Sequence, residues 1–376
     1  MREGGARMAP IRILQVMPAM DAGGMETFVM NVYRAIDRDK VQFDFVYHYD
    51  KPCFYDYEIR ALGGQIYKLT VRQDNNLPRY LHQLDRLFAE HPEYRIVHGH
   101  YSGFGMFYNA AARRRGVPVR IGHSHNTAYE PNLVGKLDKL MSARFNRDLT
   151  DRFACSRKAG EMLFGASPFT VLPNGVDTGA FARHDPEARA RLREHLGVAE
   201  DETLLGHVGR FSAQKNHAGL LRIFAAALQR RPNARLLLLG QGPLEAETRT
   251  LAQELGVADR VIFAGVRTNV QVFYHAMDAF LLPSLFEGLP VVLVEAQAAG
   301  LPCFVSDTID RGAAFADGVH FLPLGDTDAW AAALAGADLA RNPAARDQAL
   351  AAGFDVHTSA GILQEFYLRR WQEVTP

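Results

Sequence analysis

The run PSLFEGLP at residues 283–290 carries the strongest chemical signal in the sequence. It follows a short apolar run, turns at Gly288, and places Pro290 at the first position of a predicted helix. The first turn of a helix offers free backbone N–H groups that can bind phosphate. Glu287 lies just before this helix and Glu295 lies inside it, so both carboxylates could accept hydrogen bonds from hydroxyl groups beside a bound diphosphate. The alternative, that both glutamates only favour the positive end of the helix, has equal weight on this run alone.

A second run, GRFSAQKN at 209–216, directly follows another predicted strand. Gly209 at the strand's carboxyl end would let a ligand approach the backbone. Arg210 and Lys215 could neutralise a departing diphosphate, the arginine as a planar fork and the lysine as a point charge. The alternative is a solvated basic loop, because charged loop residues usually lie at the surface. The two runs support each other, since both lie at strand ends of one predicted domain.

The elements that must position these runs are short apolar strands alternating with longer helical patterns. This alternation occurs twice and predicts an α/β fold with two Rossmann-like, doubly wound domains facing each other across a cleft. We expect ligands beyond the carboxyl ends of the strands. The expected strands are 11–16, 42–47, 95–98, 118–122, 152–155, 169–172, 204–208, 234–239, 260–264, 279–282, 302–305 and 320–322; the expected helices include 25–36, 77–90, 220–230 and 245–255.

The turn-rich run PNGVD at 173–177 is the predicted junction between the domains. We therefore expect an N-terminal Rossmann-like domain over 1–173 and a C-terminal Rossmann-like domain over 174–355. The amphipathic pattern within 356–376 predicts a last helix that packs back toward the N-domain.

The composition fits a packed protein of 376 residues, with 48% hydrophobic and 22% charged residues. Lys+Arg and Asp+Glu both number 42, which gives no reason to expect a nucleic-acid-binding protein. Cys53, Cys155 and Cys303 are widely separated, so we expect reduced thiols in a cytoplasmic protein. The longest apolar run, 290–305, contains two polar residues and is too short to span a bilayer. Any membrane association would be peripheral, at the inner face.

Together the motifs resemble the retaining glycosyltransferases of GT-B family four, with their glycosyltransferase family 1 domain. The resemblance rests on Glu287 and Glu295, separated by seven residues, and on the run 209–216 upstream. It also rests on GGME at 23–26 after the first strand and on PNGVD at the junction. It extends from about residue 11 to the last helix and is strongest for members that build capsular and exopolysaccharides.

The resemblance implies a retaining, metal-independent enzyme of the hexosyltransferase type that needs no cofactor. The donor would be a nucleoside diphosphate sugar, with UDP preferred, and the acceptor a hydroxyl of a glycan or polyprenyl-linked glycan. Arg210 and Lys215 would grip the diphosphate, Glu295 the ribose, and Glu287 a hydroxyl of the transferred sugar. The implied catalytic residues are Glu287, Arg210, Lys215 and His125, and the implied donor-binding residues are Gly24, Gly209, Arg210, Lys215, Gly288, Leu289 and Glu295.

His125, in IGHSHNT at 121–127, matches the active-site histidine of the family. His123 lies two residues away, so either histidine could take that place. His98 and His100 lie at another strand end and are weaker candidates for the cleft. Gly24 would let the N-domain backbone approach the phosphate and the sugar.

Three other features have simpler interpretations. The Asp-x-Asp pattern at 326–328 precedes a helical run and is better explained as a helix cap than as a metal site. The run GQG at 240–242 follows a strand, but Glu245 stands where a dinucleotide fingerprint needs its third glycine. The basic amphipathic helix 133–145 could touch an anionic membrane, although a helix facing the N-domain core is favoured.

Two other functions stay open at this point. One is a sugar-nucleotide epimerase of similar architecture, and the other is a catalytically silent sugar-nucleotide-binding protein. The complete set of Arg210, Lys215, Glu287 and Glu295 argues against the silent protein, which would be free to lose some of them.

Overall fold

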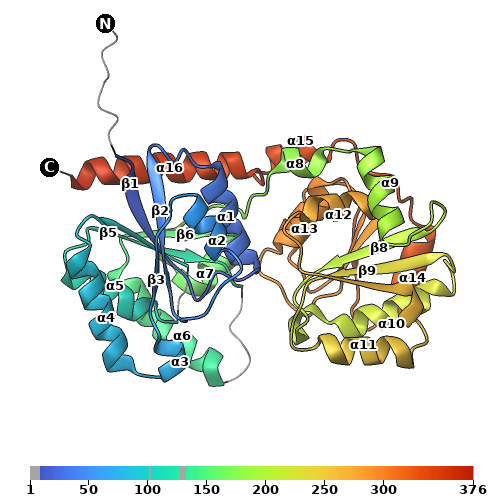
Figure 1. Ribbon diagram of the computed structural model, residues 1–376, viewed down its shortest axis with the longest axis horizontal. Helices are drawn as coiled ribbons and strands as arrows, with labels where there is room; N and C mark the ends of the chain where they lie inside the picture. Colours follow the sequence, from blue (N-terminus) through green and yellow to red (C-terminus); the bar gives the residue numbers. More distant parts are fainter. Residues whose placement is uncertain (1–8, 101–102, 128–132, 376) are drawn as a thin grey trace, which may run out of the picture. The chain divides into compact units, whose positions relative to one another are not determined.

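The computed structural model describes residues 9–100, 103–127 and 133–375 (Figure 1). The chain divides into two compact units: unit 1 is Met1–Asn174 with Val356–Pro376, and unit 2 is Gly175–Asp355. The boundary that we placed after residue 173 therefore falls one residue later in the structure. No helix in the described part of the chain combines the length and the apolar character that a membrane span requires.

Unit 1 contains a parallel sheet with the strand order β3-β2-β1-β4-β5-β6-β7. Its central strands are almost completely buried, as expected of a parallel sheet covered on both faces. The strands are β1 (Ile11–Val16), β2 (Val41–Tyr47), β3 (Ile66–Lys68), β4 (Ile96–Gly99), β5 (Val119–Ser124), β6 (Asp151–Ala154) and β7 (Thr170–Val171).

The helices of unit 1 include one that comes from the far end of the chain. This helix, α16 (Val356–Val374), lies against α1 (Figure 1). The other helices are α1 (Gly24–Ala35), α2 (Asp56–Ala61), α3 (Val71–Asp74), α4 (Leu77–Glu90), α5 (Gly105–Arg114), α6 (Leu133–Phe145), the 3-10 turn η1 (Asn146–Asp148) and α7 (Arg157–Phe164).

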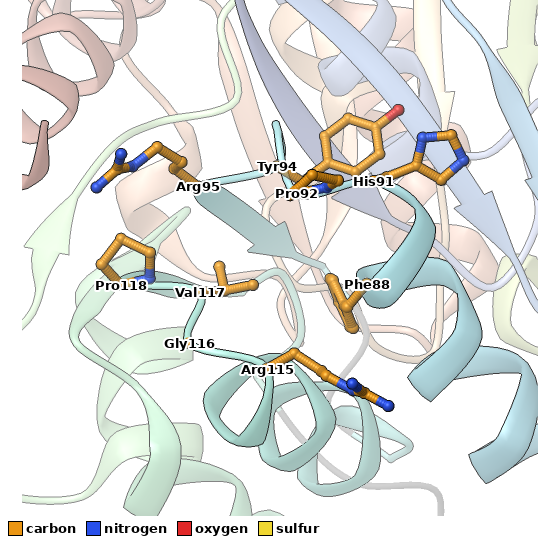
Figure 2. Close-up of a pocket in the computed structure, with 9 residues that line it drawn as sticks. All are labelled: Phe88, His91, Pro92, Tyr94, Arg95, Arg115, Gly116, Val117 and Pro118. Carbon is orange, nitrogen blue, oxygen red and sulfur yellow. The ribbon is translucent and has the colours of Figure 1, made fainter.

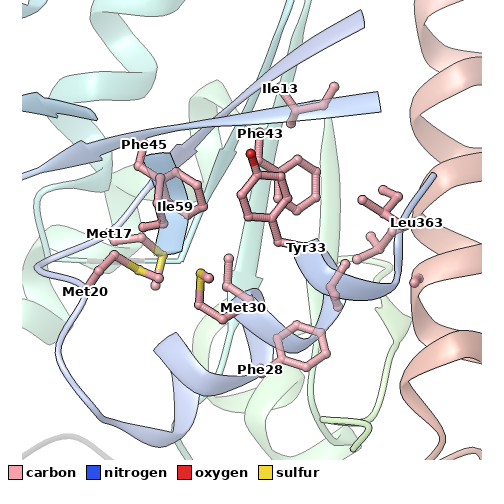
Figure 3. Close-up of a cluster of buried hydrophobic side chains, with 14 of the residues drawn as sticks. Ile13, Met17, Met20, Phe28, Met30, Tyr33, Phe43, Phe45, Ile59 and Leu363 are labelled. Carbon is pink, nitrogen blue, oxygen red and sulfur yellow. The ribbon is translucent and has the colours of Figure 1, made fainter. Parts of the chain in front are cut away.

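The hydrophobic core of unit 1 explains why α16 belongs to it. Tyr33 of α1 stacks on Phe43 of β2 with ring centroids 5.2 Å apart. Leu363 and Tyr367 of α16 are buried in the same cluster, and Figure 3 shows Leu363 beside these rings. Burying such side chains stabilises a fold by about 2 kcal/mol each. The last helix therefore completes the core of a unit whose other elements all precede residue 175.

Unit 2 contains a second parallel sheet with the order β10-β9-β8-β11-β12-β13. Counted within the unit this is 3-2-1-4-5-6, the order of a dinucleotide-binding Rossmann sheet. Its strands are β8 (Thr203–Val208), β9 (Ala234–Leu239), β10 (Val261–Gly265), β11 (Ala279–Leu282), β12 (Cys303–Ser306) and β13 (Val319–Leu322). The predicted α/β fold with two Rossmann-like sheets is confirmed.

The helices of unit 2 alternate with its strands. Asp326 caps α14 by accepting a 2.9 Å hydrogen bond from the N–H of Ala329, so the Asp-x-Asp pattern is a helix cap as expected. The helices are α8 (Thr178–Ala182), α9 (Pro186–His195), η2 (Ala213–Lys215), α10 (His217–Leu228), α11 (Glu245–Glu254), η3 (Ala258–Arg260), α12 (Val270–Ala276), α13 (Val291–Ala298), η4 (Arg311–Ala313), α14 (Thr327–Gly336) and α15 (Ala345–Ala351).

We favoured a helix over 133–145 that faces the N-domain core. Ser142 and Phe145 of α6 are buried, whereas Leu137 and Leu140 are 51% and 70% exposed. The side chain of Leu133 lies outside the described residues.

Candidate active site

The two signal runs emerge side by side in unit 2. The run 209–216 follows β8 and the run 283–290 follows β11, and these strands are hydrogen-bonded neighbours. They are also the pair at which the strand order of the sheet reverses. In open α/β sheets, ligands bind at this position, outside the carboxyl ends of the strands. The topology therefore brings together residues that lie about seventy positions apart.

Asn216 connects the two runs through the backbone conformation that it adopts. Its φ of 53° is left-handed, a region in which asparagine is tolerated better than most residues. From there its side chain caps α10 by accepting from the N–H of Gly219 at 3.1 Å. It also donates to the carbonyl of Pro283 at 3.1 Å. We assigned Asn216 no role from the sequence, and its position directly after Lys215 was the only signal for it.

Further hydrogen bonds bring Lys215 and Glu287 together. The backbone carbonyl of Gln214 accepts a hydrogen bond from the N–H of Leu285 at 2.8 Å. The side-chain amide of Gln214 donates to the carbonyl of Phe286 at 3.0 Å. Lys215 Nζ then lies 2.6 Å from Glu287 Oε1, with side chains only 15% and 7% exposed. A pair held at this depth needs its partner, because a lone buried charge is costly. The structure thus joins the cation of one run to the carboxylate of the other.

Arg210 is placed differently from Lys215. Its side chain is exposed and makes no hydrogen bond or ion pair with the part of the chain that the structure describes. An exposed guanidinium keeps its planar fork of donors available for an anion. The second predicted cation therefore has no side-chain partner among the described residues.

Two glycines fix the path of the 209–216 run. Gly240 has a φ of 135°, and a Cβ there would lie 2.1 Å from the carbonyl oxygen of Gly209. A Cβ on Gly242 would lie 2.4 Å from the carbonyl oxygen of Phe211. The GQG run after β9 therefore lets the backbone after β8 pass closely. This explains a glycine pair that lacks the rest of a dinucleotide fingerprint.

The helix after the second run begins one residue later than predicted. Pro290 is the N-cap rather than the first residue of α13, and its carbonyl accepts from the N–H of Leu293 at 2.9 Å. The amides of Val291 and Val292 precede the first bond within the helix. Gly288 and Leu289 lead into this helix start, with Leu289 buried.

Glu295 lies inside unit 2 and is paired with a tyrosine. Tyr274 of α12 donates a 2.8 Å hydrogen bond to Glu295 Oε2. Burial raises the pKa of Glu295 to about 7, against a smaller lowering effect of the Tyr274 hydrogen bond. The carboxyl group is thus poised between its two protonation states near neutral pH. Nothing in the sequence near residue 274 indicated this contact, because it joins separate helices.

In unit 1, all four candidate histidines form one array at the carboxyl ends of β4 and β5. Between the strands, ring nitrogens lie 3.3 Å apart for His98 and His123 and 2.9 Å apart for His100 and His125. Along each strand the rings stack, with centroids 4.4 Å apart for His98 and His100 and 4.2 Å apart for His123 and His125. The array therefore consists of two hydrogen-bonded rows, one on top of the other.

Burial keeps the rings of this array neutral. It lowers the pKa of His98 and of His125 to about 3 each, and it lowers the pKa of His100 and His123 well below the usual value. Within the described residues, His98, His100 and His123 are grouped closely enough to hold a metal ion. Besides the hydrogen bonds above, Nδ1 of His98 faces the hydroxyl of Tyr367 and Nε2 of His100 faces Oε1 of Gln15. Nε2 of His123 has no hydrogen-bond partner among the described residues.

Gly24 opens α1 directly after the β1 loop and is exposed. It belongs to unit 1 with His125, whereas Gly209, Arg210, Lys215, Glu287 and Glu295 belong to unit 2. Each group lies at the carboxyl edge of its own sheet.

A surface pocket of unit 1 lies away from the histidine array. It opens at the amino ends of β4 and β5, the edge opposite to the histidine array (Figure 2). It is lined by Phe88, His91, Pro92, Tyr94, Arg95, Arg115, Gly116, Val117 and Pro118.

Comparison with known proteins identifies the family. Residues 22–180 match the family model described as Glycosyltransferase Family 4, and residues 188–348 match that described as Glycosyl transferases group 1. EpsF of Bacillus subtilis strain 168, named as a glycosyltransferase, is 37% identical over 377 residues, covering 95% of this chain and 96% of EpsF. The chain belongs to the GT-B glycosyltransferases of family four. It is a glycosyltransferase of the polysaccharide-biosynthesis type.

Two other relatives bear on this glycosyltransferase. The UDP-Gal:alpha-D-GlcNAc-diphosphoundecaprenol alpha-1,3-galactosyltransferase of Escherichia coli is 30% identical over 230 residues, covering 57% of this chain and 58% of that enzyme. The crystal structure of Anabaena HepE in complex with UDP and glucose has a TM-score of 0.79 and 19% identity, covering 95% of this chain and 99% of HepE. The second similarity shows a shared GT-B fold.

Proposed function

We propose that this glycosyltransferase moves a sugar from a UDP-sugar to a hydroxyl of a glycan or polyprenyl-linked glycan and retains the anomeric configuration. The observation that carries the proposal is the 2.6 Å contact between Lys215 and Glu287 at the strand-order reversal of unit 2. It combines a cation for a diphosphate with a carboxylate for a sugar hydroxyl in one place.

The donor's diphosphate would lie against Arg210, Lys215 and the start of α13. Lys215 has three N–H donors and gives one to Glu287, which leaves others for phosphate oxygens. Arg210 is exposed and uncommitted, and the first amides of α13 carry the positive end of the helix dipole. These fixed positive groups would stabilise the charge that develops on the leaving diphosphate. We therefore propose that transfer needs no metal ion.

The two glutamates would bind different hydroxyl groups of the donor. The Glu287 carboxylate, which accepts hydrogen bonds from Lys215 and Gln214, would also accept one from a hydroxyl of the transferred sugar. Glu295, with a pKa of about 7, can act as donor or acceptor toward the ribose hydroxyls, and Tyr274 orients it. His125, which belongs to unit 1, would serve as the active-site histidine.

Retention follows if the acceptor attacks from the face that the diphosphate leaves. The bond between the anomeric carbon and the phosphate oxygen breaks as the bond to the acceptor oxygen forms. The proton of the acceptor hydroxyl passes to the departing diphosphate, so charge and atoms balance. The names of the relatives support a UDP donor and a diphosphoundecaprenol-linked acceptor.

A peripheral contact with an anionic membrane is proposed for α6. Leu137 and Leu140 are exposed on this helix together with Lys136, Lys139 and Arg144. Apolar side chains flanked by cations suit a surface of anionic lipid. We expect Lys136→Glu/Lys139→Glu to reduce sedimentation with phosphatidylglycerol vesicles, and Arg157→Glu/Lys158→Glu on α7 to change it little. Equal sedimentation with purely zwitterionic vesicles would contradict the proposal.

The function is tested by thermal-shift measurements with UDP, GDP, dTDP and their sugars, followed by transfer to a lipid-linked glycan. A ligand that binds only the native state raises the unfolding temperature. We expect UDP to give the largest shift and NMR of the product to show the donor's anomeric configuration. An inverted product would exclude retention. Conversion of the UDP-sugar without acceptor would identify an epimerase, and donor binding without any transfer would identify a silent binding protein.

A further inference from the structure

The hydrogen-bonded row that contains His125 ends at a glutamine of the central strand. His100 Nδ1 faces His125 Nε2 at 2.9 Å, and His100 Nε2 faces Gln15 Oε1 at 2.9 Å. Gln15 lies in β1, is 1% exposed, and pairs in register with His98. The Gln15 amide therefore closes one end of the row.

This arrangement determines where the protons of the row lie. A neutral imidazole has one N–H donor and one acceptor nitrogen. Because Gln15 Oε1 accepts, His100 carries its proton on Nε2 and offers a lone pair at Nδ1. His125 must then donate from Nε2, which leaves its own lone pair on Nδ1. The assignment follows from the orientation of the Gln15 amide.

The free nitrogen of His125 lies beside a second acceptor. Nδ1 of His125 and Oδ1 of Asn174 are both buried, and neither has a hydrogen-bond partner among the described residues. The two side chains are near enough for a hydrogen-bonding interaction with Asn174 to raise the pKa of His125, against the larger lowering effect of burial. Two adjacent acceptors without a donor suit a ligand hydroxyl, because unsatisfied buried polar atoms are costly.

We infer that Gln15, acting through His100, is a positioning residue that holds His125 in the tautomer whose Nδ1 accepts a hydrogen bond from a substrate hydroxyl. The inference rests on the proposed role of His125 and adds that Gln15 determines which ring nitrogen of His125 carries the proton. Without Gln15 both tautomers of the row become similar in energy. Part of the molecules would then present an N–H where a hydroxyl must donate.

The test compares two substitutions of buried glutamines in neighbouring strands. Gln15→Met removes the acceptor from the row at nearly constant volume. Gln42→Met, in β2, removes the partner of the Tyr33 hydroxyl at 2.7 Å and leaves the array intact. We expect Gln15→Met to lower kcat by about tenfold with KM changed by less than about twofold, and Gln42→Met to leave both near wild type. Gln15→Glu keeps an acceptor oxygen and should restore part of kcat.

Nuclear magnetic resonance of ¹⁵N-histidine-labelled full-length protein reads the tautomer without turnover, with the His125 signal assigned from its loss in His125→Ala. We expect the Nε2–H form in wild type and a mixture in Gln15→Met. An unchanged His125 spectrum in Gln15→Met would overturn the inference. A metal ion bound stoichiometrically in wild type and lost in His98→Ala would also overturn it. If instead the spectrum changes as expected but His125→Ala transfers sugar at the wild-type rate, the proposed role of His125 fails.

Discussion

Lys215 and Glu287, 72 residues apart in the chain, form an ion pair of 2.6 Å in which both side chains are largely buried. Each is the partner that makes burial of the other tolerable. The residues proposed to bind the diphosphate and the sugar are therefore coupled before any ligand arrives.

Removing only the cation of this pair should destabilise unit 2. Lys215→Met removes the cation that faces the buried Glu287 carboxylate, and we expect a loss of about 3 kcal/mol in the free energy of unfolding. The double variant Lys215→Met/Glu287→Leu should recover most of it, because no buried charge is left alone. Urea unfolding of the two single variants and the double variant measures the coupling. Additive losses would show that the pair is not coupled. Arg249→Met, which breaks an exposed pair with Glu245, is the control and should change stability far less.

Arg210→Ala should weaken nucleotide binding without destabilising the protein. The guanidinium is exposed and makes no described contact, so its removal costs the folded state little. A charge-assisted hydrogen bond to phosphate is worth about 1.5–3 kcal/mol, so UDP affinity should fall by about tenfold or more. Isothermal titration calorimetry with UDP measures this. Arg222→Ala, exposed on α10, serves as control, and an equal loss of affinity in both variants would contradict a specific role for Arg210.

Glu295 should make stability fall as pH rises through the weakly acidic range. Its pKa is about 7 in the folded state and 4.5 in the unfolded state, so both states are protonated below pH 4.5. Between these values only the unfolded state loses its proton, which favours unfolding by up to about 3 kcal/mol above pH 7. Glu295→Gln removes this term. Urea unfolding should show the variant gaining stability over wild type between pH 4.5 and 8, and Glu254→Gln, exposed on α11, showing no such gain. A pH-independent difference would refute the raised pKa.

Gly240→Ala should disturb the proposed diphosphate site through the backbone. The new Cβ would meet the carbonyl oxygen of Gly209 at 2.1 Å, and a φ of 135° is strained for alanine. The run 209–216 must then shift, and we expect UDP affinity to fall by at least about tenfold, since positioning depends on sub-ångström placement. Gly336→Ala, with open space around it in α14, is the matched control. Unchanged UDP binding in Gly240→Ala would show that this glycine does not support the site.

The sequence alone determined the alternating elements and the two runs that carry chemistry. Strands such as β1, β9 and β11 were predicted with their observed bounds, because a buried parallel strand is a local apolar run. The three-residue edge strand β3 was missed, since a run so short and half-buried has no periodicity to read. The caps of α13 and α14 lay within one residue of the prediction, because capping depends on adjacent residues.

Only the tertiary structure decided which side chains meet. Nothing local indicates that β8 lies beside β11, that Tyr274 reaches Glu295, or that Gln15 contacts His100. The pKa of Glu295 near 7 and the low pKa values of the four histidines arise from burial by residues distant in the chain. Chemical type and local conformation are written in neighbouring residues, whereas proximity and dielectric environment arise from how the whole core packs.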